Sequence, residues 1–262
     1  MPDNQIALRM DDVGSASKRY EIYGRTKFPL GPFHLPFPGN FLFLKYVKPF
    51  RAWGPYPELT AFEWEQILDY CKSQQLKLTV GITAGWVEYS GKVTPFPQKY
   101  PVQARILKEA NRDGLVEIAN HGYTHCILEG NQFRPRLFSS NRKWHREFWD
   151  WTPLEIQEKH IAISQDILQS FFETSVETFI PPGNVFTENT LAIAKRYKLR
   201  YLSCMGVDGK QIAGLTLIPE AQVIAFHDKE LYEHGLDWLK QLKNSIEGKK
   251  VRFICNIGQA LA

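Results

Sequence analysis

The chain lacks several features that mark well-known classes of protein. Its 262 residues include four cysteines, which lie far apart and form no CxxC pair: Cys71, Cys126, Cys204 and Cys255. Neither a disulfide framework nor a cysteine zinc site is therefore expected. No apolar run approaches the ~18 residues of a membrane-spanning helix. The N-terminus shows no basic region followed by an apolar stretch, so a secretory signal is not expected.

An excess of charge of either sign is also absent. The net charge is +4, and the basic residues are scattered, with no run of five or more. This balance permits an anionic substrate but argues against nucleic acid. Hydrophobic residues at 44% and aromatic residues at 13% support a sizeable core. We therefore predict a single domain over residues 1–262, in the cytoplasm, with no membrane span and no nucleic-acid partner. The oligomeric state stays open.

Strand-like and helix-like patterns alternate along the chain, which predicts an α/β fold with parallel strands. A buried strand is expected at residues 6–10, and the apolar run at residues 41–47 is a candidate for another. Residues 29–38 carry four prolines and are expected to be extended or irregular. Residues 152–155 predict a capping box that opens a long helix ending near residue 172.

Two pairs of polar residues follow strand-like runs. Asp11 and Asp12 come directly after residues 6–10, and His121 and His125 follow residues 116–119. Because the C-terminal ends of parallel strands meet at one face of an α/β fold, two histidines and an aspartate can surround one cation there. Each pair alone has a plainer interpretation, as a turn cap or as loop and core histidines.

Two imidazoles and one carboxylate suit a divalent metal. Zn²⁺ is favoured, with Co²⁺, Fe²⁺ and Ni²⁺ as competitors. Three protein ligands leave room for water, which is typical of a catalytic rather than a structural site. His227 also ends an apolar run, and its unperturbed pKa of ~6.5 suits a general acid. The alternative is a surface histidine paired with Asp228.

The order of four motifs is more specific than any single motif. Asp-Asp at residues 11–12, His-Gly-Tyr-Thr-His at 121–125, Pro-Pro-Gly at 181–183 and Phe-His-Asp at 226–228 follow one another along the chain. This order resembles the polysaccharide deacetylase family, the carbohydrate esterase group with the chitooligosaccharide deacetylase homology domain. The resemblance spans most of the chain and implies a distorted (β/α) barrel.

The resemblance also implies a role for each residue. The implied metal ligands are Asp12, His121 and His125. Asp11 would be the general base, and His227 would protonate the leaving amine. The backbone around Pro182 and Gly183 would bind the substrate and help hold the oxyanion. No cofactor beyond the metal is needed.

The chain departs from the family pattern at two tuning positions. The family usually has an arginine before the proline pair, and Ile180 stands there instead. The acidic residue that tunes the catalytic histidine has no clear match, with Asp208 and Asp228 as candidates. These departures indicate a divergent branch of the family.

The predicted function is a metal-dependent hydrolase that removes an N-acetyl group from an amino sugar. Since no secretory signal is expected, a nucleotide- or lipid-linked sugar in surface-polysaccharide biosynthesis fits better than a cell-wall polymer. The basic residues of 134–146 could meet a phosphate, and Trp144, Trp149 and Trp151 could stack on a sugar; a plain covering loop is the alternative. A deformylase or other C–N hydrolase, or a non-catalytic sugar-binding relative, are the competing functions.

Overall fold

The computed structural model of the chain describes residues 4–128, 130, 133–207 and 209–262. The main sheet has nine strands. In sheet order they are Gln211–Ile212 (β12), Leu215–Leu217 (β13), Tyr201–Leu202 (β11), Thr178–Phe179 (β10), Val116–Asn120 (β9), Leu78–Ile82 (β6), Gln5–Val13 (β1) and Val223–His227 (β14), with Lys250–Arg252 (β15) beside β1. All pairs are parallel except β12 with β13. Within the described residues, β12 and β14 end the strand order, so this distorted (β/α) barrel is not closed.

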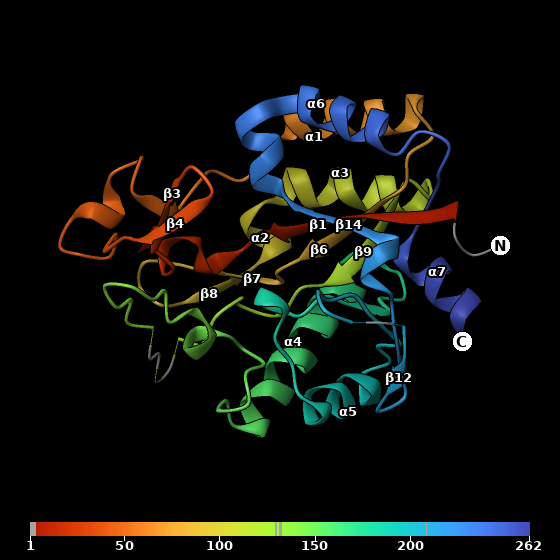
Figure 1. Ribbon diagram of the computed structural model, residues 1–262. Helices are drawn as coiled ribbons and strands as arrows, with labels where there is room; N and C mark the ends of the chain where they lie inside the picture. The colour runs from red at the N-terminus through yellow and green to blue at the C-terminus, as the bar shows by residue number, and fades with distance from the viewer. Residues whose placement is uncertain (1–3, 129, 131–132, 208) are drawn as a thin grey trace.

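Helices cover the sheet on two sides (Figure 1). Ala61–Ser73 (α1), Pro101–Arg112 (α3) and Asp228–Ser245 (α6) lie on one side, and Leu154–Phe172 (α4) and Glu188–Arg196 (α5) on the other. The short Phe96–Lys99 (α2) precedes α3, and Ile254–Leu261 (α7) ends the chain. In the described part of the chain, no helix combines the length and apolar composition needed to cross a bilayer.

Strand β1 shows how the alternation of side chains along a strand separates the apolar core from the barrel interior. Side chains of a strand point to opposite faces in turn. Ile6, Leu8 and Met10 pack into the large apolar cluster shared with α1, α3 and α6. Arg9 and Asp11 lie on the opposite face, in the barrel interior. The predicted strand at residues 6–10 is confirmed and extends three residues further, to Val13.

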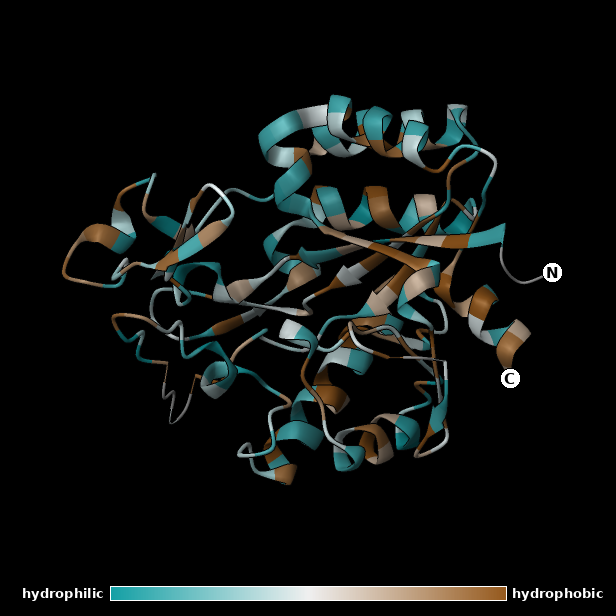
Figure 2. Cartoon of the chain, in the orientation of Figure 1, coloured by the Kyte–Doolittle hydropathy of each residue, from teal (hydrophilic) through white to brown (hydrophobic). Residues whose placement is uncertain are grey.

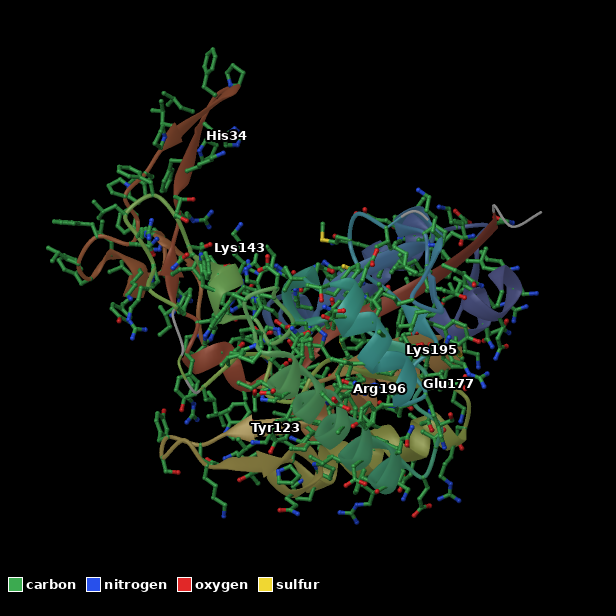
Figure 3. The ribbon with its side chains drawn as sticks, turned by 90° about the horizontal axis from the view of Figure 1, so that it is seen from below. His34, Tyr123, Lys143, Glu177, Lys195 and Arg196 are labelled. Carbon is green, nitrogen blue, oxygen red and sulfur yellow. The ribbon has the colours of Figure 1, made fainter. Side chains whose placement is uncertain are left out.

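A long excursion separates β1 from α1. Tyr23–Gly24 (β2) pairs with Arg51–Trp53 (β5), and between them Lys27–Leu30 (β3) and Phe33–Pro36 (β4) form an antiparallel hairpin. The hairpin projects away from the barrel, with His34 near its tip (Figure 3). The expectation of extended chain at residues 29–38 is thus refined to a two-stranded hairpin. A second hairpin joins Gly85–Val87 (β7) to Val93–Pro95 (β8).

Two local predictions were wrong. Residues 41–47 form a 3₁₀ turn at Leu44–Tyr46 instead of a strand, because they meet neither a strand partner nor a core. At residues 152–155, Thr152 Oγ1 donates to the carbonyl of Arg146, 3.2 Å away, so it does not cap α4. Capping boxes occur instead at Thr60 on α1 and Thr187 on α5.

Two aromatic residues of α1 provide a test of this packing. Trp64 is 2% exposed and Phe62 is 66% exposed. We expect Trp64→Ala to lower the free energy of unfolding by about 3–5 kcal/mol, because it leaves a large cavity in the core. Phe62→Ala should change it by less than about 0.5 kcal/mol. Urea denaturation followed by circular dichroism measures both, and equal losses would contradict the assigned face of α1.

Candidate metal and catalytic site

The site begins with an irregularity in β1. Adjacent residues of a regular strand point to opposite faces, which would separate Asp11 from Asp12. The pairing of β1 with β6 shifts register between Met10 and Val13, as in a β-bulge, and Asp12 has a φ of 70°. A left-handed conformation is costly for a residue other than glycine. The bulge therefore turns the Asp12 carboxylate toward the same end of the barrel that Asp11 faces.

Asp12, His121 and His125 converge there as a buried cluster. Asp12 Oδ1 lies 3.1 Å from His121 Nε2 and 3.0 Å from His125 Nε2. One potential ligand atom from each residue lies within 4.8 Å of the other two. All three side chains are nearly inaccessible to solvent. Sequence positions 109 residues apart thus meet at one point, as the sequence predicted.

Polar contacts hold the far side of each ring. His121 Nδ1 lies 2.7 Å from the carbonyl of Ile180, which can only accept, so Nδ1 carries the hydrogen. His125 Nδ1 lies 2.6 Å from Ser17 Oγ, and that hydroxyl donates to Glu21 Oε2 at 3.0 Å. Arg146 Nη1 also lies 3.0 Å from His125 Nδ1. With its hydrogen on Nδ1, His121 directs an Nε2 lone pair at Asp12.

This convergence needs a cation. Burial would raise the pKa of Asp12, but His125 and His121 outweigh burial and hold it well below its usual range. Burial lowers the pKa of His125 despite Asp12. One carboxylate oxygen and two ring nitrogens therefore face one another at close range, an arrangement that a divalent metal would satisfy. Two nitrogens and one carboxylate oxygen suit Zn²⁺.

Asp11 is held by an arginine from its own strand. Arg9 lies two residues earlier on the same face, and its Nη2 lies 2.8 Å from Asp11 Oδ2. Its Nη1 donates to Ser203 Oγ, 2.9 Å away across the barrel interior. The other oxygen, Asp11 Oδ1, is buried and accepts no hydrogen bond from the described residues. Arg9 thus supplies a cation beside Asp11, although Ile180 occupies the family's arginine position.

His227 lies next to Asp11, because the two are paired in the register of β1 and β14. Its acidic partner is Glu230, whose Oε2 lies 3.7 Å from Nδ1. Partial burial lowers the pKa of His227, but Glu230, Asp12 and Asp11 raise it to about 9. The alternative pairing with Asp228 was wrong, because that carboxylate points elsewhere. Asp208 lies outside the described residues.

Asp228 belongs to a second buried charge cluster. Its Oδ2 lies 2.8 Å from Lys18 Nζ, which also lies 2.9 Å from Glu58 Oε1. Tyr56 donates to Asp228 Oδ1 at 2.5 Å. Burial would lower the pKa of Lys18, but Asp228 and Glu58 raise it, so the lysine stays charged. The cluster ties the start of α6 to the loop after β1, since Glu58 also accepts from Gly14 N.

The turn after β10 lies against the histidine loop. Gly183 has a φ of 68° and packs on Arg146, where a Cβ would clash with the guanidinium. Pro182 packs beside Gly122 of the histidine loop. The structure therefore places the Pro182–Asn184 turn close to the cluster, which is where the sequence expected a substrate-binding backbone.

Sequence reasoning missed the carboxylates that hold the histidine loop. Glu147 Oε1 accepts from the backbone of Tyr123 and Thr124, at 3.0 and 2.9 Å. Gly122 allows this approach, because a Cβ there would meet the Glu147 carboxylate. Glu21 binds Arg146 through both oxygens. Arg9 had a signal in the sequence, its spacing of two from Asp11, whereas Glu21 and Glu147 had none.

The basic and aromatic residues between 134 and 151 were candidates for contact with a phosphate and a sugar. Arg146 is buried and bound to Glu21, so it is not free to meet a phosphate. Arg142 donates to Tyr23 at 2.6 Å. Trp144 and Trp151 pack on each other with ring centroids 6.1 Å apart. This part of the stretch is thus a structural cover next to the site.

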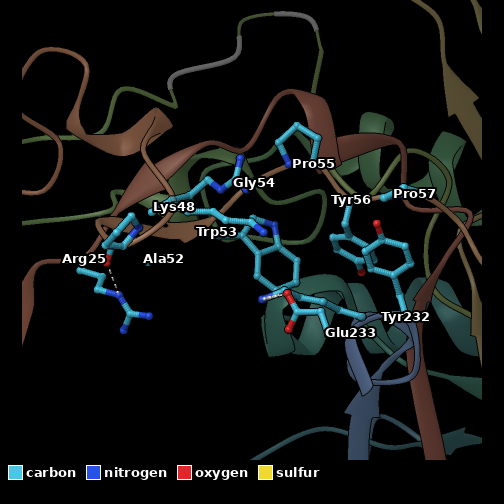
Figure 4. A pocket seen from close by; sticks show the side chains of 13 residues that line it. Arg25, Lys48, Ala52, Trp53, Gly54, Pro55, Tyr56, Pro57, Tyr232 and Glu233 are labelled. Atoms are coloured by element: carbon cyan, nitrogen blue, oxygen red, sulfur yellow. Dashed lines mark hydrogen bonds and ion pairs between the residues drawn. The ribbon is translucent and has the colours of Figure 1, made fainter. Parts of the chain in front are cut away.

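A cavity of about 850 Å³ opens between the segment before α1 and the start of α6 (Figure 4). Its wall includes Trp53, whose ring centroid lies 5.5 Å from that of His227. The cationic residues on its lining are Arg25, Lys48, Arg51 and Lys229, and the aromatic ones are Trp53, Tyr56 and Tyr232. The cavity therefore combines positive charge with ring faces.

Zinc titration tests the ligand assignment. Asp12→Ala and His125→Ala should abolish binding, because each removes one of three ligands. Asp11→Asn should spare it, since Asp11 is held by Arg9 instead. Ser17→Ala should weaken affinity roughly 10–100-fold, because it releases the far side of the His125 ring. Competition with a chromophoric chelator measures each affinity, and zinc retained at full strength by Asp12→Ala would refute the assignment.

Comparisons with known proteins address the family. A sequence profile of the polysaccharide deacetylases matches residues 55–202, more than half of the chain. No curated protein sequence matches this chain. A Mycobacterium smegmatis protein assigned to the polysaccharide deacetylases aligns with a TM-score of 0.59 at 11% identity, over 100% of this chain and 92% of that one.

Two further structures align over 98% of this chain. One is a peptidoglycan N-acetylglucosamine deacetylase, with a TM-score of 0.53, 16% identity and 89% of its own chain covered. The other is a CE4 family pseudoenzyme from Bacillus anthracis, with a TM-score of 0.52, 13% identity and 66% of its chain covered. At these identities the likeness concerns the fold. Because the profile covers more than half of the chain, including the histidine loop, this chain belongs to the polysaccharide deacetylase family.

Proposed function

We propose that the protein is a metal-dependent N-deacetylase acting on an N-acetylated amino sugar that carries a phosphate group. The observation that supports this most is the arrangement at one barrel end. The buried cluster of Asp12, His121 and His125 lies beside Asp11 and His227, which are paired across β1 and β14. A metal site flanked by a candidate base and a candidate acid is the constellation that amide hydrolysis requires.

Each residue has a task in the proposed reaction. Asp12, His121 and His125 would hold a divalent cation, which polarises the acyl carbonyl and lowers the pKa of a nearby water. Asp11 would take a proton from the attacking water through Oδ1, while Arg9 holds Oδ2. His227, protonated at neutral pH, would pass its proton to the leaving amine. The Pro182–Asn184 turn would position the acyl group.

The proposed substrate class is supported by the cavity that Trp53, the neighbour of His227, helps to line. Trp53, Tyr56 and Tyr232 offer faces on which a sugar ring can stack. Its four cationic side chains outnumber the acidic residue on its wall, Glu233. A nucleotide- or lipid-linked amino sugar, with its phosphates on this side, fits that charge. A cytoplasmic role in surface-polysaccharide assembly is part of the same proposal.

A non-catalytic role is the competing proposal, because a pseudoenzyme of this fold is known. Asp11→Asn separates the two. We expect it to lower kcat by roughly 10²–10⁴-fold, since the attacking water loses its base, while zinc stays bound. Amine release from N-acetyl and N-formyl amino sugars, free and nucleotide-linked, measures turnover across the panel. Sugar binding without turnover at any metal would favour the non-catalytic role.

The pH profile tests His227 as the acid. The residue donates only when protonated, so kcat should fall as pH rises through about 9. Glu230→Gln removes a carboxylate that raises the pKa of His227, and the alkaline limb should move to lower pH.

Glu247→Gln, at an exposed position just after the end of α6, is the matched control and should leave the limb unchanged. An alkaline limb that stays in place in Glu230→Gln would remove His227 from the acid role, whatever the activity at neutral pH.

A further inference from the structure

The excursion at residues 22–57, here called the arm, differs in charge from the rest of the chain. It contains five of the 32 lysines and arginines and none of the 28 aspartates and glutamates. The remaining residues therefore carry 27 basic against 28 acidic side chains. The positive charge of the whole protein resides in this one segment. Its five cations are Arg25, Lys27, Lys45, Lys48 and Arg51.

The arm also gathers exposed apolar side chains. Among the described residues, eight of the eighteen large hydrophobic side chains that are exposed belong to it. They are Leu30, Phe33, Leu35, Phe41, Leu42, Phe43, Tyr46 and Val47. Phe33 is 70% exposed and Leu42 is 68% exposed. The apolar segments lie on the part of the chain that stands out from the barrel (Figure 2). A patch of this kind on a folded protein marks an interaction surface.

The exposure does not reflect a lack of structure. Phe28, Phe37 and Phe50 form a small aromatic core at the base of the hairpin, with ring centroids 4.9–6.5 Å apart. Gly24 and Gly39 allow the two backbone segments that carry them to approach closely. A Cβ on Gly24 would clash with the backbone of Gly39, and a Cβ on Gly39 would clash with the backbone of Arg25. The arm is thus a built element whose outer side chains face solvent.

A second segment extends the same surface. Asn40 Nδ2 donates to the carbonyl of Arg136, 2.7 Å away, and so joins the arm to the loop after the histidines. In that loop Leu137 and Phe138 are exposed next to Arg136. Two segments about 100 residues apart in sequence therefore present the same combination of apolar and basic side chains.

We propose that the arm docks the protein on an anionic membrane surface. Leucine and phenylalanine side chains ringed by lysine and arginine are the composition of interfacial membrane anchors, in which apolar groups enter the headgroup boundary and cations meet anionic lipids. Exposed leucines offer no hydrogen bonds to a sugar polymer. The absence of carboxylates removes the repulsion that acidic headgroups would exert. The base of the arm lines the cavity through Arg25, Lys48 and Arg51, and Trp53 of the same cavity packs on His227, so docking would place the cavity at the bilayer.

Vesicle sedimentation without substrate tests docking independently of the proposed deacetylase activity. The purified chain should bind equimolar phosphatidylcholine–phosphatidylglycerol vesicles far more than phosphatidylcholine alone, and added salt should weaken binding. Phe33→Ser/Phe43→Ser should lower the partition coefficient at least roughly tenfold. Phe62→Ser on α1, with an equally exposed phenylalanine, is the matched control and should change nothing.

Charge is tested in the same assay. Lys27→Gln/Lys45→Gln should lower binding to anionic vesicles by about fivefold per removed charge. Lys72→Gln/Lys249→Gln, two exposed lysines elsewhere, should have no comparable effect. Circular dichroism and urea unfolding should show all four variants folded, because none of the changed side chains is buried.

Three results would overturn the proposal. The first is absence of the wild-type chain from the vesicle pellet, and the second is an equal loss of vesicle binding in the arm variants and their controls. The third is a shift from dimer to monomer in Phe33→Ser/Phe43→Ser, measured by sedimentation velocity. The last result would assign the arm to contact with a second copy of the chain. Each leaves the zinc and turnover measurements untouched, so docking and deacetylation can fail separately.

Discussion

The bulge at Asp12 is the constraint on which the rest of the site depends. A regular β1 would send neighbouring carboxylates to opposite faces, one into the helices and one into the barrel. The left-handed backbone at Asp12 instead brings both carboxylates to one end, at a conformational cost. His125 has the same unusual backbone, with a φ of 61°. Strain of this kind persists only where surrounding contacts fix it.

Those contacts are buried ion pairs and hydrogen bonds. Glu21 and Ser17 hold the ring of His125, Glu147 holds the loop before it, and Arg9 holds Asp11. Removing one partner of a buried pair leaves an uncompensated charge, which is more costly than losing an exposed pair. The polar interior of the barrel thus keeps the ligand atoms in place, while the apolar clusters against the helices stabilise the fold.

In the proposed function, chemistry and binding of the substrate are divided between two parts of the molecule. The barrel end holds the cluster and its candidate acid and base, and the arm with the start of α6 surrounds the cavity beside them. Trp53 links the two, since it lines the cavity and packs on His227. The barrel's fold is shared with solved structures of the family, and the arm carries positive charge and exposed apolar side chains.

The sequence by itself determined the α/β pattern and the residues that converge, because strand ends in such folds meet at one face. Apolar runs precede all five of these residues, which are Asp11, Asp12, His121, His125 and His227. It could not determine what holds them. Glu21, Glu147 and Glu230 look like ordinary surface carboxylates until the chain folds around them. Residues 41–47 were read as a strand because apolar sequence alone does not reveal whether a core or a partner strand is nearby. Tertiary structure decided both, since burial and pairing depend on neighbours distant in the chain.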